Sequence, residues 1–436
     1  MQYEKKTYKY LYYLLMGFNL LTLVIYLSNP FWVNSGYHGL AVVFICISLF
    51  FLGWGYKTGL KKGTTIKAIP NKSFLSEINH KTLQLYMVFY VLTFLMKYAY
   101  ELHCHLFDIG GLVRRIALGI SDPYLGYTMS LGETYRPFRW SVYVFICLFD
   151  GIFFIVGLLS WKKLKKGEKW LFIILSLIEL LKGLGSGSSF GEIKMITTLA
   201  VVLLVNLKDV RLTRKQKNTL LLGLVMAFFS AVFIFGYNMS GRSGGEFSDT
   251  LGDSLNFNQE SFINKYLISH LSKSMQNFYV YICNYLVHGY YNFEYAFAVD
   301  YDWTWFFGSN DAKTNMLKII AGVDVEQYNY QMKILKQFQV DPYVSWHSCY
   351  LWLANDVSLF GVPFVLFLVG RYTGFALVLF RRYDDLLSGI ICVIFANMVL
   401  FLFANNNYIA NLFYSFLILF PVWLFTRYIS KSLVSN

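Results

Sequence analysis

The chain has 436 residues, of which 56% are hydrophobic and only 14% are charged, and its formal net charge is +13. This composition excludes a soluble globular protein, in which about a quarter of the residues are charged. The positive charge does not indicate nucleic-acid binding, because the lysines lie in short runs between apolar blocks, as in the cytoplasmic loops of membrane proteins.

Ten apolar blocks follow one another along the chain, and most approach the ~20 residues needed to cross a hydrocarbon core of about 30 Å. Because backbone amides in lipid must be satisfied within their own segment, we expect each block to be a helix. The blocks are Leu11–Leu27, Leu40–Trp54, Leu83–Tyr100, Val142–Leu159, Trp170–Leu184, Ile193–Leu207, Leu220–Tyr237, Gly361–Phe380, Leu386–Phe403 and Ile409–Phe425. They predict an all-α polytopic membrane protein with about ten transmembrane helices.

The basic residues lie before the first block and after every second one, which gives the orientation of the spans. Lysine runs occur at residues 5–9, 57–81, 162–169 and 208–217, whereas the connections Ser28–Gly36 and Ala404–Asn407 contain no Lys or Arg. Since basic loops stay inside, this alternation predicts that both termini are cytoplasmic. No small-residue cleavage site precedes Pro30, so we interpret Met1–Asn29 as an uncleaved first span.

This orientation leaves two long segments on the outer side. Glu101–Arg139 contains a stretch, Asp108–Ile120, that we expect to form a short interfacial helix. Met239–Phe360 is predicted to be a large periplasmic loop, in which Phe262–Phe297 has helical apolar spacing and aromatic residues suited to the headgroup level. The chain therefore divides into membrane spans 1–7 (residues 1–238), the periplasmic loop (239–360) and spans 8–10 (361–436).

Five arginines lie on the predicted outer side: Arg114, Arg115, Arg136, Arg139 and Arg242. The guanidinium group is a planar fork that binds phosphate through two hydrogen bonds. These residues therefore form either a cluster that collects an anionic headgroup or ordinary outer-loop charge.

Ionisable residues within the blocks are a second set of candidates, since charges at membrane depth are costly and are often functional. Glu179 and Lys182 lie three residues apart in the fifth block, hence on one helix face, where they either bind substrate or pair with each other. Arg371, near the middle of the eighth block, either reaches a polar cavity or extends toward the inner membrane surface.

His347 lies just before the eighth block, with Asp356 further along the same segment. A neutral histidine there could take a proton from a sugar hydroxyl, although packing at the interface is equally consistent with its position. No metal site is predicted, because the six cysteines are scattered and the adjacent residues His103, Cys104 and His105 cannot all face one ion.

The number of spans, the cytoplasmic termini and the large outer loop resemble the Wzy-type O-antigen polymerases, which join the oligosaccharide repeat units of bacterial surface polysaccharides. Gly185-Ser186-Gly187-Ser188-Ser189-Phe190 is similar to that family's Gly-Ser-Arg-Ser-like turn, with Gly187 where Arg is often found. Tyr285-Leu286-Val287-His288-Gly289 resembles its Tyr-Leu…Gly step in the outer loop. Asp356-Val357-Ser358-Leu359-Phe360-Gly361 resembles its Asp-x-Gly-x-x-Gly entry to a late span, with Ser358 in place of the first Gly.

The resemblance implies a metal-independent glycosyltransferase of the bacterial inner membrane, without a cofactor, that polymerises undecaprenyl-pyrophosphate-linked oligosaccharides at the periplasmic face. It implies as partners this lipid-linked substrate, membrane lipid, a chain-length regulator and a flippase. Such a reaction needs cations around the departing pyrophosphate and a base near the acceptor oxygen. Under this interpretation His347 and Arg242 are the catalytic candidates, and the substrate-binding candidates are Arg114, Arg115, Arg136, Arg139, Glu179, Lys182, Asp356 and Arg371.

Two alternatives remain open. A lipid-linked oligosaccharide flippase or other transporter would place charged residues along the interior of the bundle and keep its outer loops short. An O-antigen ligase would share the architecture and the lipid-pyrophosphate donor.

Overall fold

The computed structural model describes residues 4–28, 30–33, 35–66, 79–132, 135–185, 190–206, 222, 256–258, 260–261, 264–266, 270–342, 345–405 and 409–429. In these residues almost all regular structure is helical. The two strands, β1 (Phe31–Trp32) and β2 (Asn256–Phe257), pair antiparallel with Phe31 opposite Phe257. The helical fold is therefore confirmed for the described residues. The predicted seventh span, apart from Leu222, and Arg242 lie outside them.

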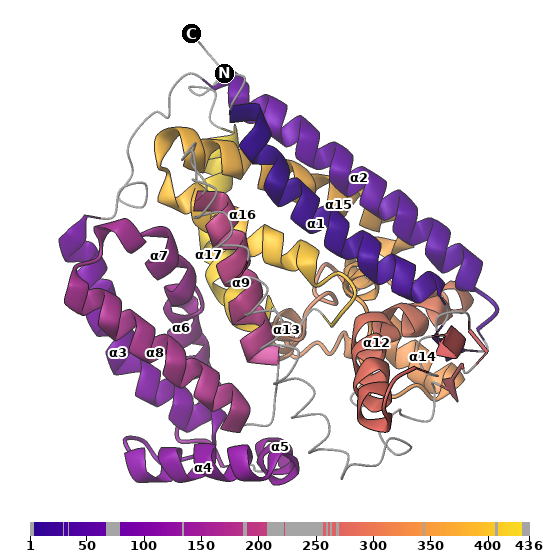
Figure 1. The fold of residues 1–436 in the computed structure, drawn as a ribbon, viewed down its shortest axis with the longest axis horizontal. Helices are drawn as coiled ribbons and strands as arrows, with labels where there is room; N and C mark the ends of the chain where they lie inside the picture. The colour runs from indigo at the N-terminus through magenta and orange to yellow at the C-terminus, as the bar shows by residue number, and fades with distance from the viewer. Residues whose placement is uncertain are drawn as a thin grey trace.

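Two groups of long helices flank a central group (Figure 1). One flank consists of α1 (Glu4–Leu27), α2 (His38–Thr65) and α15 (Cys349–Tyr383). The other consists of α3 (His80–Glu101), α6 (Trp140–Asp150), α7 (Phe153–Leu159) and α8 (Lys166–Gly185), with the 3-10 turn η1 (Trp161–Lys163). The central group consists of α9 (Phe190–Asn206), α16 (Leu386–Leu400), α17 (Ile409–Trp423) and the π-helical turn η5 (Leu424–Ile429).

Five described segments are long and apolar enough to cross a membrane: Tyr8–Leu27, His38–Thr65, His80–Glu101, Trp140–Leu159 and Cys349–Tyr383. Large apolar side chains such as Leu21, Phe50, Leu85 and Phe145 are exposed on them, as expected of helices that face lipid. Three further apolar helices are shorter, at Ile193–Asn206, Leu386–Leu400 and Leu412–Tyr428. The chain is a helical membrane protein by these features.

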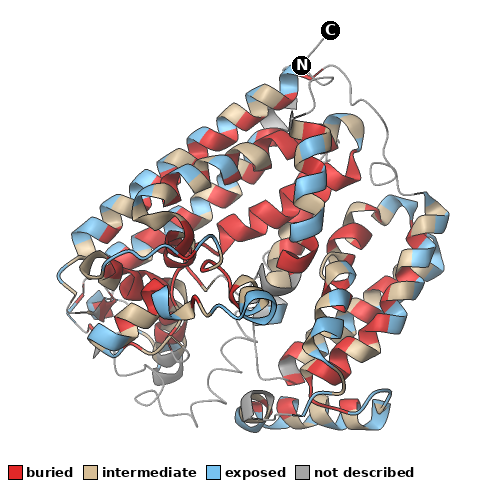
Figure 2. Ribbon diagram, turned by 180° about the vertical axis from the view of Figure 1, so that it is seen from behind, coloured by how far each residue is buried: buried red, intermediate tan, exposed pale blue. Residues whose placement is uncertain are grey.

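The core lies around α16, in which every residue from Leu386 to Leu400 is buried. Figure 2 shows the buried residues concentrated in the central helices and the exposed ones on the outward faces of the flanking helices. A helix that is apolar on all sides belongs inside a bundle, so α16 can be fully enclosed although it has only 15 residues.

Three predicted span boundaries differ from the structure. α2 continues beyond Trp54 to Thr65, because its later turns pack closely against α15. The predicted span Val142–Leu159 is two helices, α6 and α7, separated at Gly151 and Ile152. α15 begins at Cys349 rather than Gly361, so it continues across residue 360, and it contains a kink at Ser358.

The two ends of the bundle hold different parts of the chain. At one end, which we call the inner end, the start of α1 meets α2 through a hydrogen bond from the Tyr56 hydroxyl to the Tyr8 carbonyl (3.0 Å). Asp385, which precedes α16, pairs there with Arg427 of η5 at 3.2 Å. Lys62 near the end of α2 donates to the Tyr428 carbonyl of η5 (3.4 Å), so the first and last described residues lie at the same end.

The opposite end, which we call the outer end, carries the remaining helices (Figure 1). These include α4 (Ile109–Ser121), α5 (Pro123–Gly132), α12 (Lys273–Glu294), α13 (Asp311–Ala321) and α14 (Tyr330–Phe338), with the 3-10 turns η2 (Tyr295–Ala298) and η3 (Glu326–Tyr328). α12 is fixed to the end of α1 and the start of α2 by Glu294, which accepts hydrogen bonds from Tyr26 (2.5 Å) and His38 (2.8 Å).

Candidate functional site

Six ionisable residues from four helices gather between α3, α6, α8 and α9, and we call them the ionic cluster: Lys97, Glu101, Asp150, Glu179, Lys182 and Lys194. Lys182 lies 2.5 Å from Glu101 and 3.0 Å from Glu179. Lys97 lies 2.6 Å from Asp150 and 3.7 Å from Glu179. Tyr98 donates a hydrogen bond to Glu179, and Tyr143 donates one to Glu101 at 2.9 Å. The predicted pairing of Glu179 with Lys182 is thus part of a larger network.

Lys194 is the lysine of the ionic cluster that forms no ion pair among the described side chains, although the charges of Glu179 and Glu101 attract it. It lines the same small cavity of about 220 Å³ as Lys97, Asp150, Glu179 and Lys182. Among the described residues, however, no carboxylate forms an ion pair with it. An ammonium group held at membrane depth without a partner is costly, which favours a role in binding an anion.

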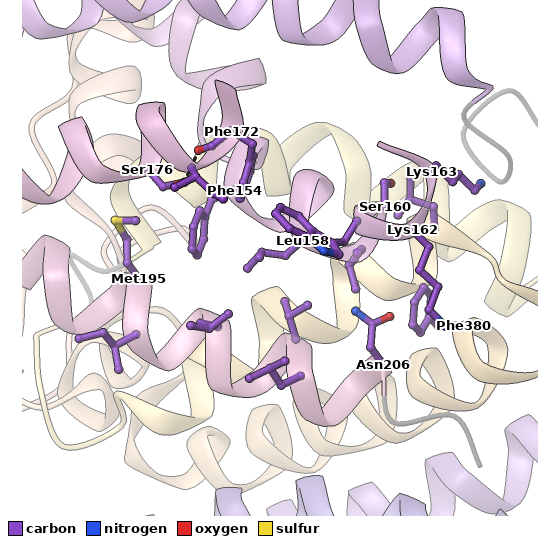
Figure 3. Close-up of a pocket in the computed structure, with 18 of the residues that line it drawn as sticks. Phe154, Leu158, Ser160, Lys162, Lys163, Phe172, Ser176, Met195, Asn206 and Phe380 are labelled. Atoms are coloured by element: carbon purple, nitrogen blue, oxygen red, sulfur yellow. Dashed lines mark hydrogen bonds between the residues drawn. The ribbon is translucent and has the colours of Figure 1, made fainter. Parts of the chain in front are cut away.

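A larger apolar cavity of about 1190 Å³ adjoins the ionic cluster. Phe154, Ser176 and Met195 line both cavities, so the two are neighbours. In Figure 3 the large cavity extends from Ser176 and Met195 toward Lys162, Asn206 and Phe380, with Phe154, Leu158 and Phe172 along its sides. Its far part is lined by His80, Lys162 and Asp384, which lie at the inner end. It exceeds the ~300–1,000 Å³ of ordinary small-molecule sites.

The local sequence explains how the ionic cluster is held together. Lys97 and Glu101 lie four residues apart on α3 and therefore share a face. Asp150 is the last residue of α6, where the helix is interrupted before α7. At the outer end, Gly119 of α4 packs so closely on the end of α8 that an added Cβ would lie 1.7 Å from the Gly185 carbonyl oxygen. Glycine thus allows α4 to contact the end of the helix that carries Glu179 and Lys182.

The four predicted outer arginines that the structure describes do not form one cluster. Arg115 donates to the Leu102 carbonyl (3.3 Å) and Arg136 to the Tyr100 carbonyl (3.1 Å), so both bind the C-terminal end of α3. Arg114 is exposed and donates to Gly110 of its own helix. Arg139 is exposed and precedes α6 by one residue, one turn before Tyr143 of the ionic cluster's network. Arg115 and Arg136 therefore lie beside Glu101, the last residue of α3 and a member of the ionic cluster.

His347 is buried rather than open to the outer face. Only 1% of it is exposed, and neither ring nitrogen has a hydrogen-bond partner among the described residues. Burial, with a smaller contribution from the neighbouring His288, lowers the pKa of His347 to about 3. The ring is therefore neutral, as a general base must be, but the enclosing side chains would have to move before a hydroxyl could reach it.

The two remaining candidates serve other parts of the structure. Asp356 accepts backbone hydrogen bonds from Gly308 (2.7 Å) and Ser309 (3.1 Å) and pairs with Lys313 at 2.5 Å, so it holds the loop before α13. Arg371 lies near the rings of Phe367 and Tyr428, on the side of η5. Neither is part of the ionic cluster.

One of the resembled stretches, residues 285–289, packs against the segment that precedes α15. Gly289 of α12 approaches the backbone so closely that an added Cβ would lie 2.3 Å from the Phe403 carbonyl oxygen and 2.9 Å from the Ser348 nitrogen. Its carbonyl accepts a hydrogen bond from Ser348 (3.2 Å), while His288 stacks on Trp346. The glycine of the Tyr-Leu…Gly stretch is thus required by close packing. Residues 186–189 of the Gly-Ser stretch lie outside the described residues.

Sequence reasoning missed four members of the ionic cluster, Lys97, Glu101, Asp150 and Lys194. The signal was available for Lys97, Asp150 and Lys194, because each is an ionisable residue inside a predicted apolar block. What the sequence could not supply was which faces of the third, fourth, fifth and sixth blocks meet.

Comparisons of the chain with protein-family models, with curated proteins and with solved structures find no match.

Proposed function

We propose that this chain polymerises undecaprenyl-pyrophosphate-linked oligosaccharide repeat units into surface polysaccharide, O-antigen or capsule, at the periplasmic face of the bacterial inner membrane. In this proposal it is a metal-independent membrane glycosyltransferase with about ten spans, its inner end faces the cytoplasm, and it works with a chain-length regulator and a flippase. The observation that carries the proposal is the junction of a long apolar cavity with the ionic cluster that contains Lys194.

The two parts of this junction match the two parts of a polyprenyl diphosphate. A long isoprenoid chain needs an extended apolar cavity, which the side chains of α7, α8 and α9 supply. The diphosphate needs cations, and Lys194 is available for it because no carboxylate of the described residues pairs with it. Arg136, which binds the Tyr100 carbonyl next to Glu101, supplies a second positive charge at the outer end of the ionic cluster.

The same groups suit the proposed reaction. The acceptor hydroxyl loses its proton to a base, its oxygen bonds to the anomeric carbon of the growing glycan, and the bond from that carbon to the diphosphate oxygen breaks. The electron pair of that bond leaves on the diphosphate, so cations beside it stabilise the transition state. The ordered helices α4, α5, α12 and α14 at the outer end favour chemistry on that side.

A second candidate function is transport of a lipid-linked oligosaccharide. Two observations favour it: the large cavity reaches residues of the inner end, and the span that carries Asp150 is broken at Gly151, as helices near transporter binding sites often are. The ionic cluster also contains more charge at membrane depth than the sequence analysis counted. An O-antigen ligase is the remaining alternative.

Lys194→Gln tests the site. Because Lys194 forms no ion pair among the described side chains, the purified variant should keep its melting temperature. Lys182→Gln should lower it, because Glu101 would lose its ion pair and Glu179 would keep only the 3.7 Å pair with Lys97. In nanodiscs, Lys194→Gln should bind a synthetic polyprenyl diphosphate about ten- to a hundredfold more weakly, as expected for the loss of a charge-assisted contact.

Lys81→Gln is the matched control, since Lys81 is an exposed lysine of α3 that lines neither cavity. It should bind the lipid like the parent. Unchanged binding by Lys194→Gln would remove the ionic cluster from the proposed substrate site.

A further inference from the structure

An exposed group of three aromatic rings lies at the outer end, in the loop that precedes α13. Trp303 is 45% exposed, Trp305 62% and Phe306 58%. The two indole rings stack with centroids 4.5 Å apart and an interplanar angle of 28°, and the Phe306 ring meets Trp303 edge-on at 5.5 Å. We call these three residues the aromatic platform.

The backbone beneath the aromatic platform has an unusual conformation. Trp305 and Phe306 both have positive φ, 56° and 65°. Bulky residues seldom adopt this conformation, and two in succession persist only where the surrounding structure holds them. Such conformations are concentrated at binding and catalytic sites, because the strained backbone there holds side chains in the position that the ligand requires.

Buried polar residues of α15 hold the loop from below. Thr304, which separates the two tryptophans in the sequence, is fully buried and donates a hydrogen bond to the Asn355 carbonyl at 2.7 Å. One Asp356 oxygen accepts the Gly308 and Ser309 amides, and the other pairs with Lys313. Asn355 donates to the Gly308 carbonyl at 2.9 Å. The aromatic platform is therefore fixed before any ligand arrives, which lowers the entropy lost on binding.

The charges beside the aromatic platform favour a neutral polar ligand over a lipid surface. Lys313 donates a hydrogen bond to the Phe306 carbonyl at 2.5 Å, but its charge is balanced by Asp356. The Asp302 side chain is 52% exposed and pairs with Lys333 at 2.7 Å. The charges beside the aromatic platform are thus paired, whereas an anchor for anionic headgroups carries an excess of Lys or Arg. A carboxylate and an ammonium beside flat apolar rings can instead meet hydroxyl groups.

We propose that the aromatic platform binds a sugar ring of the glycan. The apolar C–H face of a pyranose lies against the indole rings, and its hydroxyls reach Asp302 and Lys333. The ligand class rests on the proposed function, since it is the repeat-unit oligosaccharide of that reaction. The aromatic platform and the ionic cluster are built from different helices, so the two sites can hold the glycan and the lipid diphosphate of a substrate separately.

The test is calorimetric titration of the full chain in nanodiscs with the lipid-free repeat-unit oligosaccharide from the host's own polysaccharide. Trp303→Ala and Trp305→Ala should each weaken binding about 5- to 150-fold, if stacking of a sugar on one aromatic ring contributes as much as stacking of a nucleobase, on the order of 1–3 kcal/mol. Trp170→Ala is the control: Trp170 is 58% exposed on α8, away from the loop, and its loss should leave binding unchanged.

Parent-like binding by both platform variants, with their melting temperatures unchanged, would overturn the inference. So would quenching of Trp303 and Trp305 by brominated lipid, since that would make the aromatic platform a membrane anchor. Binding of polyprenyl diphosphate through Lys194 is measured separately, so failure of the sugar site and failure of the proposed function give different results.

Discussion

At the scale of single residues, Ser358 has the most unusual backbone among the residues of the helices. Its φ of 60° and ψ of 171° lie in a region that essentially only glycine occupies, and they produce the kink within α15. The kink follows directly after Asn355 and Asp356, the two residues that hold the aromatic platform's loop. The resembled Asp-x-Gly-x-x-Gly pattern has its first glycine at this position, and the structure gives a physical reason for glycine there.

Ser358→Gly should therefore stabilise the protein. The substitution removes strain of about 1–3 kcal/mol, and the greater freedom of glycine in the unfolded chain offsets part of it, which leaves about 1 kcal/mol. The measurement is the apparent melting temperature in detergent. Ser348→Gly is the control, because Ser348 has an ordinary φ of −68°, and it should be neutral or destabilising. A lower melting temperature for Ser358→Gly than for the parent would contradict the account of the kink.

A contact between two site residues could be predicted only where the two are close in the sequence. Glu179 and Lys182 were found because a spacing of three places both on one helix face, and they do contact each other. Lys194 could not be joined to them, because the contact between α8 and α9 is a tertiary one. Burial of His347 was not visible either, since it depends on α12, whose His288 lies more than fifty residues earlier in the chain.

At the scale of elements, the most extensive close packing joins α2 to α15 through glycines. Gly55, Gly59 and Gly63 repeat every four residues on α2, and Gly370 and Gly374 do so on α15. A Cβ added to Gly59 would lie 2.0 Å from the Arg371 carbonyl oxygen, and one added to Gly374 would lie 2.4 Å from that of Tyr56. Small residues at this spacing let two membrane helices approach closely. The sequence contains this signal, and it also explains why α2 stays helical to Thr65 instead of ending near Trp54.

Gly59→Ala should destabilise the protein by about 1–3 kcal/mol, because the backbone of α15 cannot move aside as a flexible side chain could. Gly17→Ala is the matched control. Gly17 lies within α1, and a Cβ there meets nothing within 4 Å, so alanine should be neutral or stabilise by up to about 1 kcal/mol through its helix propensity. Chemical unfolding of the two variants in mixed micelles measures the difference. Equal stabilities would show that α2 and α15 are not packed in this way.

At the scale of the whole molecule, composition and the pattern of basic residues predicted a helical membrane protein, and the long apolar helices agree with that. The number of spans remains a prediction. The described residues contain five segments that have the length and hydropathy of a span and three shorter apolar helices. They also contain α8, a continuous helix that carries the charged residues Glu179 and Lys182. Sequence patterns could not predict that an apolar cavity adjoins the ionic cluster, because both cavities are lined by residues from several helices that are far apart in the chain.

The two candidate functions differ in which step fails when the protein is lost. Without a polymerase, the lipid-linked unit still reaches the periplasm, where a ligase attaches it singly to the lipopolysaccharide core. Without a flippase, the unit stays inside and nothing is attached. For a host whose polysaccharide is carried on lipopolysaccharide, we expect a deletion strain to produce core bearing one repeat unit and no ladder. Complementation with Lys81→Gln should restore the ladder, and Lys194→Gln should not, since it lacks the cation that stabilises the departing diphosphate. Bare core without the single-unit band would identify the loss as that of a flippase or ligase and would refute polymerisation as the activity.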